Sequence, residues 1–175
     1  MLSTQELRAL VKSLDAKAFV AQLGPFALVQ RPPAEAMGDP NAGIPQTAMA
    51  STAHREQGVL GLIFEFDNLH VATLPPMTGE DTLSVGRLPD CDLIVDEASV
   101  SKRHAMLTWH EDTQRCSLKD LGSTNGTFLN ASIKLHGEVS LRDGDIISFG
   151  DVQFWYLLTE TLFAKLKSAG ATFSV

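Results

Sequence analysis

The sequence contains very little cysteine. Its 175 residues include only Cys91 and Cys116, which are too few for the disulfide framework of a small secreted protein. Neither belongs to a C-x-x-C motif, and no cluster of histidines or carboxylates has metal-ligand spacing. We therefore expect free thiols in a reducing compartment, with Cys116 a small core residue, and we expect neither a metal nor a cofactor.

Long apolar runs are also missing. No segment approaches the roughly 20 consecutive apolar residues that a membrane-spanning helix requires, and the N-terminus lacks the basic and apolar regions of a secretion signal. The sequence therefore predicts a cytoplasmic protein that does not use a membrane as a partner.

Positive charge is in deficit, because 14 Lys and Arg residues stand against 21 Asp and Glu residues, for a net charge of −7. Affinity for nucleic acid depends largely on Lys and Arg at phosphates, so we do not expect nucleic acid as a partner. Catalytic motifs are absent as well: the sequence shows no nucleophile beside a base, no paired carboxylates in a cleft-like context and no G-x-x-x-x-G-K-[ST] loop. We therefore expect a protein that is not an enzyme.

Residues 1–28 have the pattern of two short helices. Ser3 and Glu6 are spaced as a capping box, which predicts a helix over about residues 4–14. Asp15 can cap a second helix that ends before Gly24 and Pro25. The apolar faces of the two helices contain Leu7, Leu10, Val11, Leu14, Ala18, Phe19 and Leu23. We interpret this segment as an amphipathic hairpin that docks on another part of the protein; the alternative is a partner-binding or dimerising element.

Residues 29–57 are rich in Pro, Ala and Gly, which predicts a linker. The acidic balance lies beyond it, because residues 59–175 carry the whole net charge of −7. The linker contains the hydroxyl residues Thr47, Ser51 and Thr52.

Residues 58–158 consist of short β-rich runs separated by polar turns, which predicts an all-β domain: an antiparallel β-sandwich of about 10–11 short strands. A helix is expected after Thr159, within residues 159–175. The expected strands cover residues 59–66, 69–74, 82–85, 93–95, 105–109, 115–120, 127–129, 137–140, 145–149 and 152–158. The expected core or half-buried residues are Phe64, Phe66, Leu107, Trp109, Leu118, Phe128, Ile147, Phe149, Phe154 and Tyr156.

Polar motifs follow one another in the turns between these strands. Arg87 follows Gly86 and offers a planar fork of donors, and Ser101 and Thr124 offer hydroxyl groups. A phosphorylated side chain brings close to two negative charges and three acceptor oxygens, and therefore requires donors of this kind. The motifs in chain order are Gly86-Arg87, Ser101-Lys102-Arg103-His104, Ser123-Thr124-Asn125-Gly126-Thr127 and Asn130.

This order and spacing resemble the forkhead-associated (FHA) domain, a family of phosphothreonine-binding β-sandwiches of the SMAD/FHA-like fold, over roughly residues 60–158. The resemblance implies that phosphothreonine is bound by Arg87, Ser101, Lys102, Thr124 and Asn125. It further implies that Asn125 and Asn130 bind the peptide backbone, that Arg103 is a candidate for peptide contact, and that Gly86, His104 and Gly126 are structural.

The resemblance implies a phosphothreonine-dependent protein–protein interaction module in signalling by Ser/Thr kinases, with a phosphothreonine protein or peptide as partner and a kinase upstream. A small FHA protein with an Ala/Pro-rich linker suits bacterial kinase signalling. The protein's own linker, phosphorylated at Thr47 or Thr52, is a further candidate ligand. The alternative function is a phosphate-independent scaffold or oligomerisation protein that uses the sandwich face or the N-terminal helices.

Overall fold

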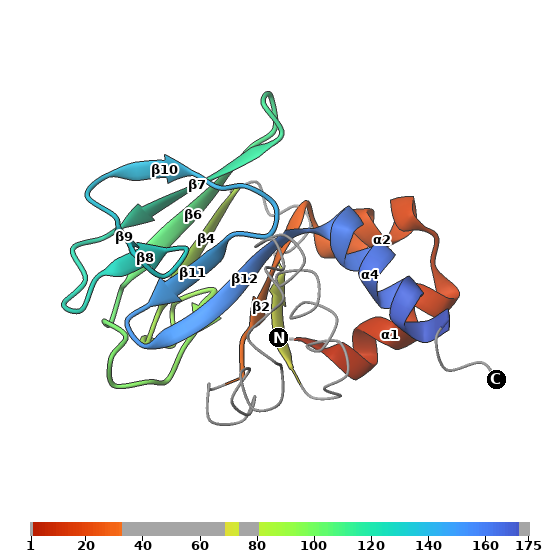
Figure 1. Ribbon diagram of the computed structural model, residues 1–175, viewed down its shortest axis with the longest axis horizontal. Coiled ribbons are helices and arrows are strands. Elements are labelled where there is room, and N and C mark those ends of the chain that lie inside the picture. Colours follow the sequence, from red (N-terminus) through yellow and green to blue (C-terminus); the bar gives the residue numbers. More distant parts are fainter. Residues whose placement is uncertain (1, 33–68, 74–80, 172–175) are drawn as a thin grey trace, which may run out of the picture.

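The computed structural model describes residues 2–32, 69–73 and 81–171 (Figure 1). The strand expected at residues 59–66, with Phe64 and Phe66, and most of the expected linker, with Thr47, Ser51 and Thr52, lie outside the described residues.

The described strands form two sheets that face each other as a sandwich. A seven-stranded sheet has the order β1-β3-β2-β12-β11-β8-β9, and a five-stranded sheet has the order β10-β7-β6-β4-β5. Neighbouring strands are antiparallel except for β4 and β5, which are parallel. The strands are β1 (Leu2–Ser3), β2 (Phe26–Gln30), β3 (His70–Thr73), β4 (Thr82–Gly86), β5 (Leu93–Ile94), β6 (Ala105–His110), β7 (Arg115–Asp120), β8 (Thr127–Leu129), β9 (Ile133–Lys134), β10 (Glu138–Ser140), β11 (Ile146–Phe149) and β12 (Val152–Leu158).

The expected β-sandwich is confirmed, and each expected strand within the described residues is present to within a residue or so at its ends. The sequence analysis did not anticipate β1, β2 or β9. The strand β2 lies inside the seven-stranded sheet between β3 and β12, although its residues fell at the border between the expected helical segment and the linker. Its sequence, FALVQ, is a short and nearly continuous apolar run, as is typical of a strand buried on both faces.

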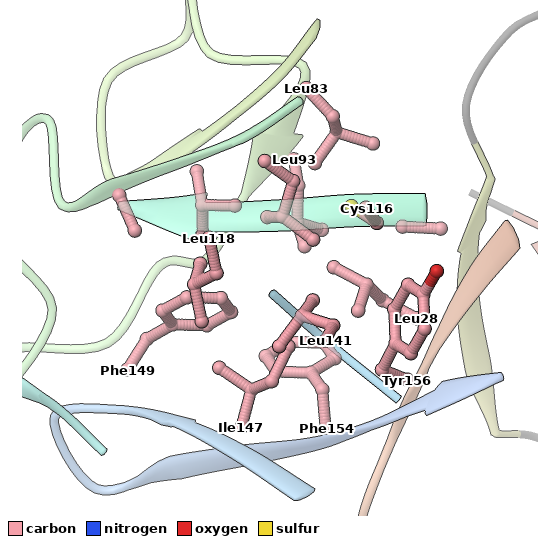
Figure 2. Close-up of a cluster of buried hydrophobic side chains, with 14 of the residues drawn as sticks. Leu28, Leu83, Leu93, Cys116, Leu118, Leu141, Ile147, Phe149, Phe154 and Tyr156 are labelled. Atoms are coloured by element: carbon pink, nitrogen blue, oxygen red, sulfur yellow. The ribbon is translucent and has the colours of Figure 1, made fainter. Parts of the chain in front are cut away.

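Alternate residues of the strands fill the space between the two sheets. Leu83, Cys116 and Leu118 project from the five-stranded sheet toward Phe149 and Tyr156 of the seven-stranded sheet (Figure 2). The expected core residues are confirmed among the described residues, since all of them are buried except the half-buried Phe128. This alternation follows from the two-residue period of a β-strand.

The described residues also form three helices, α1 (Thr4–Ser13), α2 (Ala16–Leu23) and α4 (Thr159–Ala171). The helix α1 begins with the expected capping box between Ser3 and Glu6. The Asp15 side chain accepts the Ala18 N–H at 2.7 Å and so caps α2. None of the described helices is long and apolar enough to cross a membrane.

These helices cover the outer face of the seven-stranded sheet and create a second apolar core (Figure 1). Trp155 and Leu157 of β12 point into this core, whereas their neighbours Phe154 and Tyr156 point into the sandwich. The rings of Phe19 in α2 and Phe163 in α4 lie 5.3 Å apart. The N-terminal helices therefore dock on the protein's own sheet. The other buried residues of the second core are Leu7, Leu23, Ala27, Val29, Leu69, Val71, Leu162 and Leu166.

The turn between β8 and β9 contains two residues in left-handed backbone conformation. Asn130 has a φ of 50° and Ala131 a φ of 69°. Asparagine tolerates this region, but the Cβ of alanine is crowded by its own backbone there. Ala131 is exposed, so no packing interaction compensates for this crowding.

We predict that Ala131→Gly stabilises the protein by about 0.5–1 kcal/mol, because relief of the crowded conformation exceeds the added entropy of the unfolded chain. Denaturant unfolding measures the change. The matched control is Ala164→Gly, at an exposed position of α4, which should destabilise the protein by about 1 kcal/mol because glycine is a poor helix former. Equal destabilisation by the two substitutions would contradict the left-handed strain at Ala131.

Candidate functional site

Three loops that carry the polar motifs meet at one end of the sandwich. They are residues 87–92 between β4 and β5, residues 95–104 between β5 and β6, and residues 121–126 between β7 and β8; we call them the site loops. The Arg87 N–H donates to the Ser101 carbonyl at 3.1 Å, which joins the first loop to the second. The Thr124 N–H donates to the Ser101 hydroxyl at 3.0 Å, which joins the third loop to the second. Ser101 therefore lies at the centre of the three loops.

Arg87 is placed by its neighbour Gly86. A Cβ atom at Gly86 would collide with the Lys102 carbonyl oxygen, so only glycine lets the first and second loops approach this closely. The Arg87 side chain is exposed, and its Nε donates to the Val100 carbonyl at 2.6 Å. Its two terminal nitrogens donate to no group of the described residues. The guanidinium is thus oriented by one bond and retains free donors for an anion.

Two hydroxyl groups lie beside each other in the site, and one of them belongs to Ser101, whose backbone carbonyl contacts the Arg87 N–H. The Ser101 Oγ and the Thr124 Oγ1 are 3.5 Å apart, and both residues are accessible to solvent. The next residue, Asn125, uses one amide hydrogen to donate to the Ser99 carbonyl at 2.8 Å. That bond fixes the plane of the Asn125 amide, whose oxygen has no partner among the described residues. The structure therefore brings Arg87, Ser101, Thr124 and Asn125 together.

His104 is fully buried beneath these loops. Its Nδ1 accepts the Ser101 N–H at 3.0 Å, and its Nε2 lies 3.1 Å from the Gly126 carbonyl oxygen. Because Nδ1 accepts, Nε2 carries the proton and donates to Gly126, so the ring is neutral and in a single tautomer. His104 therefore supports Ser101 and the Asn125-Gly126 turn from below, and no part of its ring is left for catalysis.

Burial lowers the pKa of His104 below its ordinary value of 6.5, because a charged ring loses its hydration in the interior. The hydrogen bond to Gly126 and the negative charge of Asp120 act in the opposite direction but do not outweigh burial. The direction of this pKa shift agrees with the neutral tautomer that the two hydrogen bonds require.

Asp120, at the end of β7, is a positioning residue that the sequence analysis missed. Its carboxylate accepts hydrogen bonds from the Gly122 N–H, the Ser123 N–H, the Ser123 hydroxyl and the Thr127 hydroxyl, at 2.6–3.0 Å. Burial raises the pKa of Asp120, but these hydrogen bonds together outweigh burial and hold the pKa below the ordinary 3.8. An aspartate followed after one residue by Gly-Ser has the pattern of an Asx-turn, which is the signal that would have identified it.

Ser99 is a second residue that the sequence analysis missed. Its carbonyl receives the Asn125 amide, and its hydroxyl accepts the Asp151 N–H at 3.0 Å. The Gly126 carbonyl also accepts the Gly150 N–H at 3.2 Å. The site loops are thus tied to the β11–β12 turn of the seven-stranded sheet, and both sheets hold the site.

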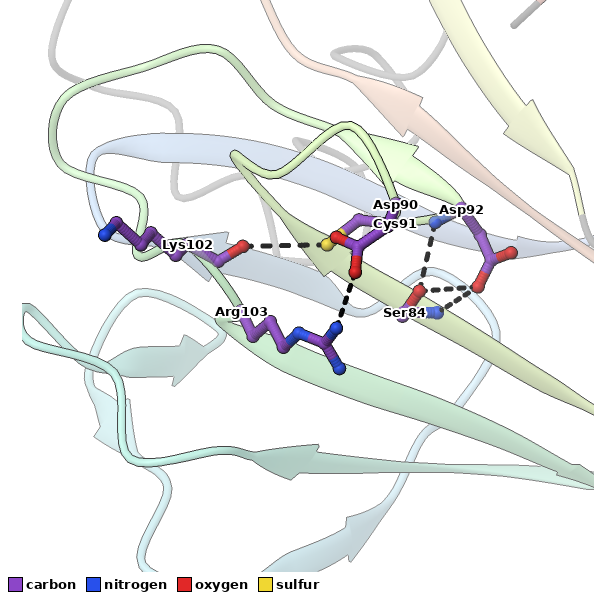
Figure 3. A network of polar contacts seen from close by, with 6 residues as sticks. All are labelled: Ser84, Asp90, Cys91, Asp92, Lys102 and Arg103. Atoms are coloured by element: carbon purple, nitrogen blue, oxygen red, sulfur yellow. Dashed lines mark hydrogen bonds and ion pairs between the residues drawn. The ribbon is translucent and has the colours of Figure 1, made fainter.

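The two basic residues after Ser101 differ in their surroundings. Arg103 is exposed and forms an ion pair with Asp90, with Nη2 and Oδ2 2.5 Å apart. The Lys102 side chain is also exposed and extends away from this pair (Figure 3). The Lys102 backbone carbonyl accepts the Leu88 N–H at 3.1 Å and the Cys91 thiol at 3.6 Å. Lys102 therefore offers an unneutralised charge, whereas the charge of Arg103 is already compensated.

Asn130 lies outside the site loops. It follows β8, at the opposite end of that strand from Asn125 and Gly126, and four residues of extended chain span about 13 Å. Its amide nitrogen donates to the Asp145 carboxylate and its amide oxygen accepts the Ile146 N–H, each at 3.0 Å. Both ends of the side chain therefore hold the β8–β9 turn against β11, and peptide binding by Asn130 stays a prediction.

The site loops present hydrogen-bond donors to solvent. The described residues include no group of three or more His, Cys, Asp or Glu side chains that could hold a metal ion. Both cysteines are buried and unpaired within the described structure, and burial raises the pKa of Cys116 to about 12. What the site loops present to solvent is a guanidinium, an ammonium, two hydroxyls and an amide, which together suit the binding of an oxyanion.

Comparison with known proteins identifies the family of this site. The family model described as the FHA domain matches residues 83–150. The oxoglutarate dehydrogenase inhibitor of Corynebacterium jeikeium is 35% identical over 78 residues, which cover 45% of this chain and 51% of that protein. The human nuclear inhibitor of protein phosphatase 1 is 39% identical over 77 residues, which cover 43% of this chain and 22% of that protein. The chain thus spans about half or less of the length of these curated relatives.

Solved structures of FHA domains resemble the chain as well. One, from a study of phosphothreonine-dependent FHA domain interactions, is 31% identical with a TM-score of 0.44, over 50% of this chain and 83% of that one. The yeast Dun1 FHA domain in complex with a doubly phosphorylated peptide is 19% identical with a TM-score of 0.49, over 79% of this chain and 77% of that one. The matched residues 83–150 contain all three site loops, and this part of the chain is an FHA domain.

Proposed function

We propose that the site loops bind a phosphothreonine residue of a partner protein, and that the protein acts as a non-enzymatic interaction module in Ser/Thr kinase signalling. The observation that carries this proposal is the exposed guanidinium of Arg87, oriented by Val100, near two hydroxyl groups that are 3.5 Å apart. A phosphorylated side chain near neutral pH carries close to two negative charges and three acceptor oxygens. The guanidinium of Arg87 and the ammonium of Lys102 can balance this charge, and the guanidinium and the two hydroxyls offer donors to the three oxygens.

Each residue of the site has a role in the proposal. The terminal nitrogens of Arg87 donate to two phosphate oxygens, and the hydroxyls of Ser101 and Thr124 donate to the phosphate from the other side. The unpaired ammonium of Lys102 adds a second positive charge. The amide of Asn125, held in plane by Ser99, accepts a backbone N–H of the bound peptide through its free oxygen. Arg103 contacts the peptide only if the ligand displaces Asp90.

The family comparisons give independent support. Among the matched structures, Mycobacterium tuberculosis EmbR is in complex with a low-affinity phosphopeptide, and the yeast Dun1 FHA domain is in complex with a doubly phosphorylated peptide. Relatives include the bacterial transcriptional regulatory protein EmbR and the bacterial oxoglutarate dehydrogenase inhibitor, and this likeness supports the bacterial part of the proposal.

The protein's own linker is the finer proposal for a ligand. Strands β2 and β3 are antiparallel neighbours, so the chain leaves the sheet after Arg31 and returns before Leu69 at the same end. The Arg31 N–H donates to the Gln153 carbonyl at 2.8 Å. Gln153 follows Asp151 by two residues, and Asp151 contacts Ser99 of the site loops. Thr47 follows Pro32 by 15 residues, and a chain of that length reaches up to about 50 Å. Tethering therefore raises the local concentration of a phosphorylated Thr47 or Thr52 to about the millimolar range.

Arg87→Ala is predicted to weaken phosphothreonine peptide binding at least about a hundredfold, because hydrogen bonds to charged groups contribute about 1.5–3 kcal/mol each and Arg87 makes two in the proposal. Calorimetric titration with phosphothreonine, phosphoserine and unphosphorylated forms of one peptide library measures it. The matched control is Arg115→Ala, an exposed arginine at the far end of β7, which should leave affinity unchanged. Full affinity in Arg87→Ala would show that the site assignment is wrong, and binding that is indifferent to phosphorylation would favour a phosphate-independent scaffold.

A second prediction concerns the neutral state of His104. Folding lowers the pKa of the His104 ring below its unfolded value of 6.5. The stabilisation from the neutral ring is therefore present above pH 6.5 and is lost as pH falls from there through the folded pKa. Wild-type protein should therefore lose unfolding free energy as pH falls below 6.5. His104→Gln should be less stable at neutral pH and should lack this component of the pH dependence. Parallel curves of unfolding free energy against pH for the two proteins would exclude this role of His104.

The linker proposal makes a third prediction. Protein phosphorylated in vitro at Thr47 or Thr52 should bind an external phosphothreonine peptide about tenfold or more weakly, because the tethered ligand competes at a high effective concentration. The double variant Thr47→Ala with Thr52→Ala, treated with the same kinase, is the control and should keep its affinity. If phosphorylation leaves external affinity unchanged while Arg87→Ala still abolishes it, the linker is not a ligand although the site is correct.

A further inference from the structure

Lys134 lies across the Asn125-Gly126 turn of the site loops. It belongs to the edge strand β9 and pairs with Phe128 of β8. The next residue continues the pairing, since the Leu135 N–H donates to the Thr127 carbonyl at 2.9 Å. Because Lys134 and the residue after it both pair with β8, the backbone of Lys134 is fixed relative to the turn that presents Thr124 and Asn125.

The absence of a side chain at Gly126 gives Lys134 its place. Gly126 has a φ of 89°, which glycine adopts without strain. A Cβ atom there would lie 2.9 Å from the Cε of Lys134 and 3.5 Å from its Nζ. The end of the lysine side chain therefore rests on the backbone of Gly126, and its ammonium is held at the surface of the turn.

The ammonium of Lys134 has no anionic partner in the described structure. The residue is exposed, and its side chain forms no ion pair or hydrogen bond with any described residue. Arg103 provides the contrast, because its charge is compensated by Asp90. The chain has a net charge of −7, yet this lysine has no carboxylate partner and lies beside a surface rich in donors. An anionic ligand would supply the partner that the lysine lacks.

We propose that Lys134 is a further binding residue of the site, and that its ammonium contacts an anionic oxygen of the ligand. This inference rests on the proposed function of the site loops. The oxygen belongs either to the phosphate or to a carboxylate of the peptide next to the phosphothreonine, and the two sources present the same chemistry to the lysine. Lys134 enters the site from the seven-stranded sheet, whereas Arg87 and Lys102 belong to loops of the five-stranded sheet.

The test is titration of the full chain with two phosphothreonine peptides, one flanked by alanines and one flanked by aspartates. Lys134→Gln should bind about three- to tenfold more weakly, as is usual for removal of a positive charge at the rim of an interface. The difference from wild type should shrink as salt is raised, because the screening length falls from about 30 Å at 0.01 M to about 10 Å at 0.1 M. Lys134→Arg, which keeps the charge, should recover most of the affinity.

Lys119→Gln is the matched control. Lys119 is also an exposed lysine of a strand, but it lies on β7 of the other sheet, and its loss changes the net charge by the same amount. Weaker binding of both peptides by Lys134→Gln alone would identify the phosphate as the source of the oxygen, and weaker binding of only the aspartate-flanked peptide would identify a carboxylate.

Two outcomes would overturn the inference, and they are distinguishable. If wild-type protein binds the peptides, Arg87→Ala does not, and Lys134→Gln equals wild type at low salt, Lys134 is not a binding residue although the proposed function stands. If Lys134→Gln and Lys119→Gln lose the same affinity, the effect is one of net charge only. If wild-type protein binds neither peptide, the proposed function fails, and the role of Lys134 fails with it.

Discussion

The buried imidazole of His104 joins two loops whose contacting residues, His104 and Gly126, are 22 positions apart in the sequence. One ring nitrogen receives the backbone N–H of Ser101 and the other donates to the backbone carbonyl of Gly126. Both partners are main-chain groups: without the ring the Ser101 N–H would need another acceptor, whereas the Gly126 carbonyl would keep only the Gly150 N–H. The relative position of the Ser101 hydroxyl and the Asn125-Gly126 turn, on which the proposed phosphate site depends, is therefore set from beneath by an uncharged side chain.

This arrangement requires a rigid base, and the seven-stranded sheet provides it. Its central strands are buried on both faces, by the sandwich core on one side and by the three described helices on the other. Phe154 and Trp155 illustrate this, since adjacent residues of β12 enter different cores. The N-terminal segment therefore contributes a central strand and two helices to the same body, although the family model covers only residues 83–150.

The fold class and the main site residues could be predicted because each is encoded locally. Alternating apolar residues reveal strands, and the order of Gly86-Arg87, Ser101, His104 and Asn125-Gly126 reveals loops of a known kind. The strand β2 could not be distinguished by pattern, because a five-residue apolar run is compatible with either a strand or the end of a helix. Its partner strands, β3 and β12, are distant in sequence, so only tertiary pairing identifies it.

The residues that the sequence analysis missed share one property, namely that backbone geometry determines their role. Asp120 and Ser99 act through hydrogen bonds to main-chain groups of neighbouring loops. Lys134 lies against the Asn125-Gly126 turn only because β9 pairs with β8 and Gly126 leaves room for it. Asn130 likewise takes its surroundings from the direction of β8, which carries it to the other end of that strand, where it contacts Asp145 and Ile146.

The distribution of charge explains how an acidic protein can bind an anion. Charge far from the site contributes little at physiological salt, because the screening length is about 8 Å. What acts on a phosphate is the local set of cations, and here Arg87, Lys102 and Lys134 lack carboxylate partners among the described residues, whereas Arg103 is paired with Asp90. The acidic remainder disfavours other polyanions such as nucleic acid, for which several phosphates must be neutralised at once. In the proposed function, a single phosphorylated side chain requires only the few cations that the site loops and β9 supply, so a chain with a net charge of −7 can still offer a local site for one anion.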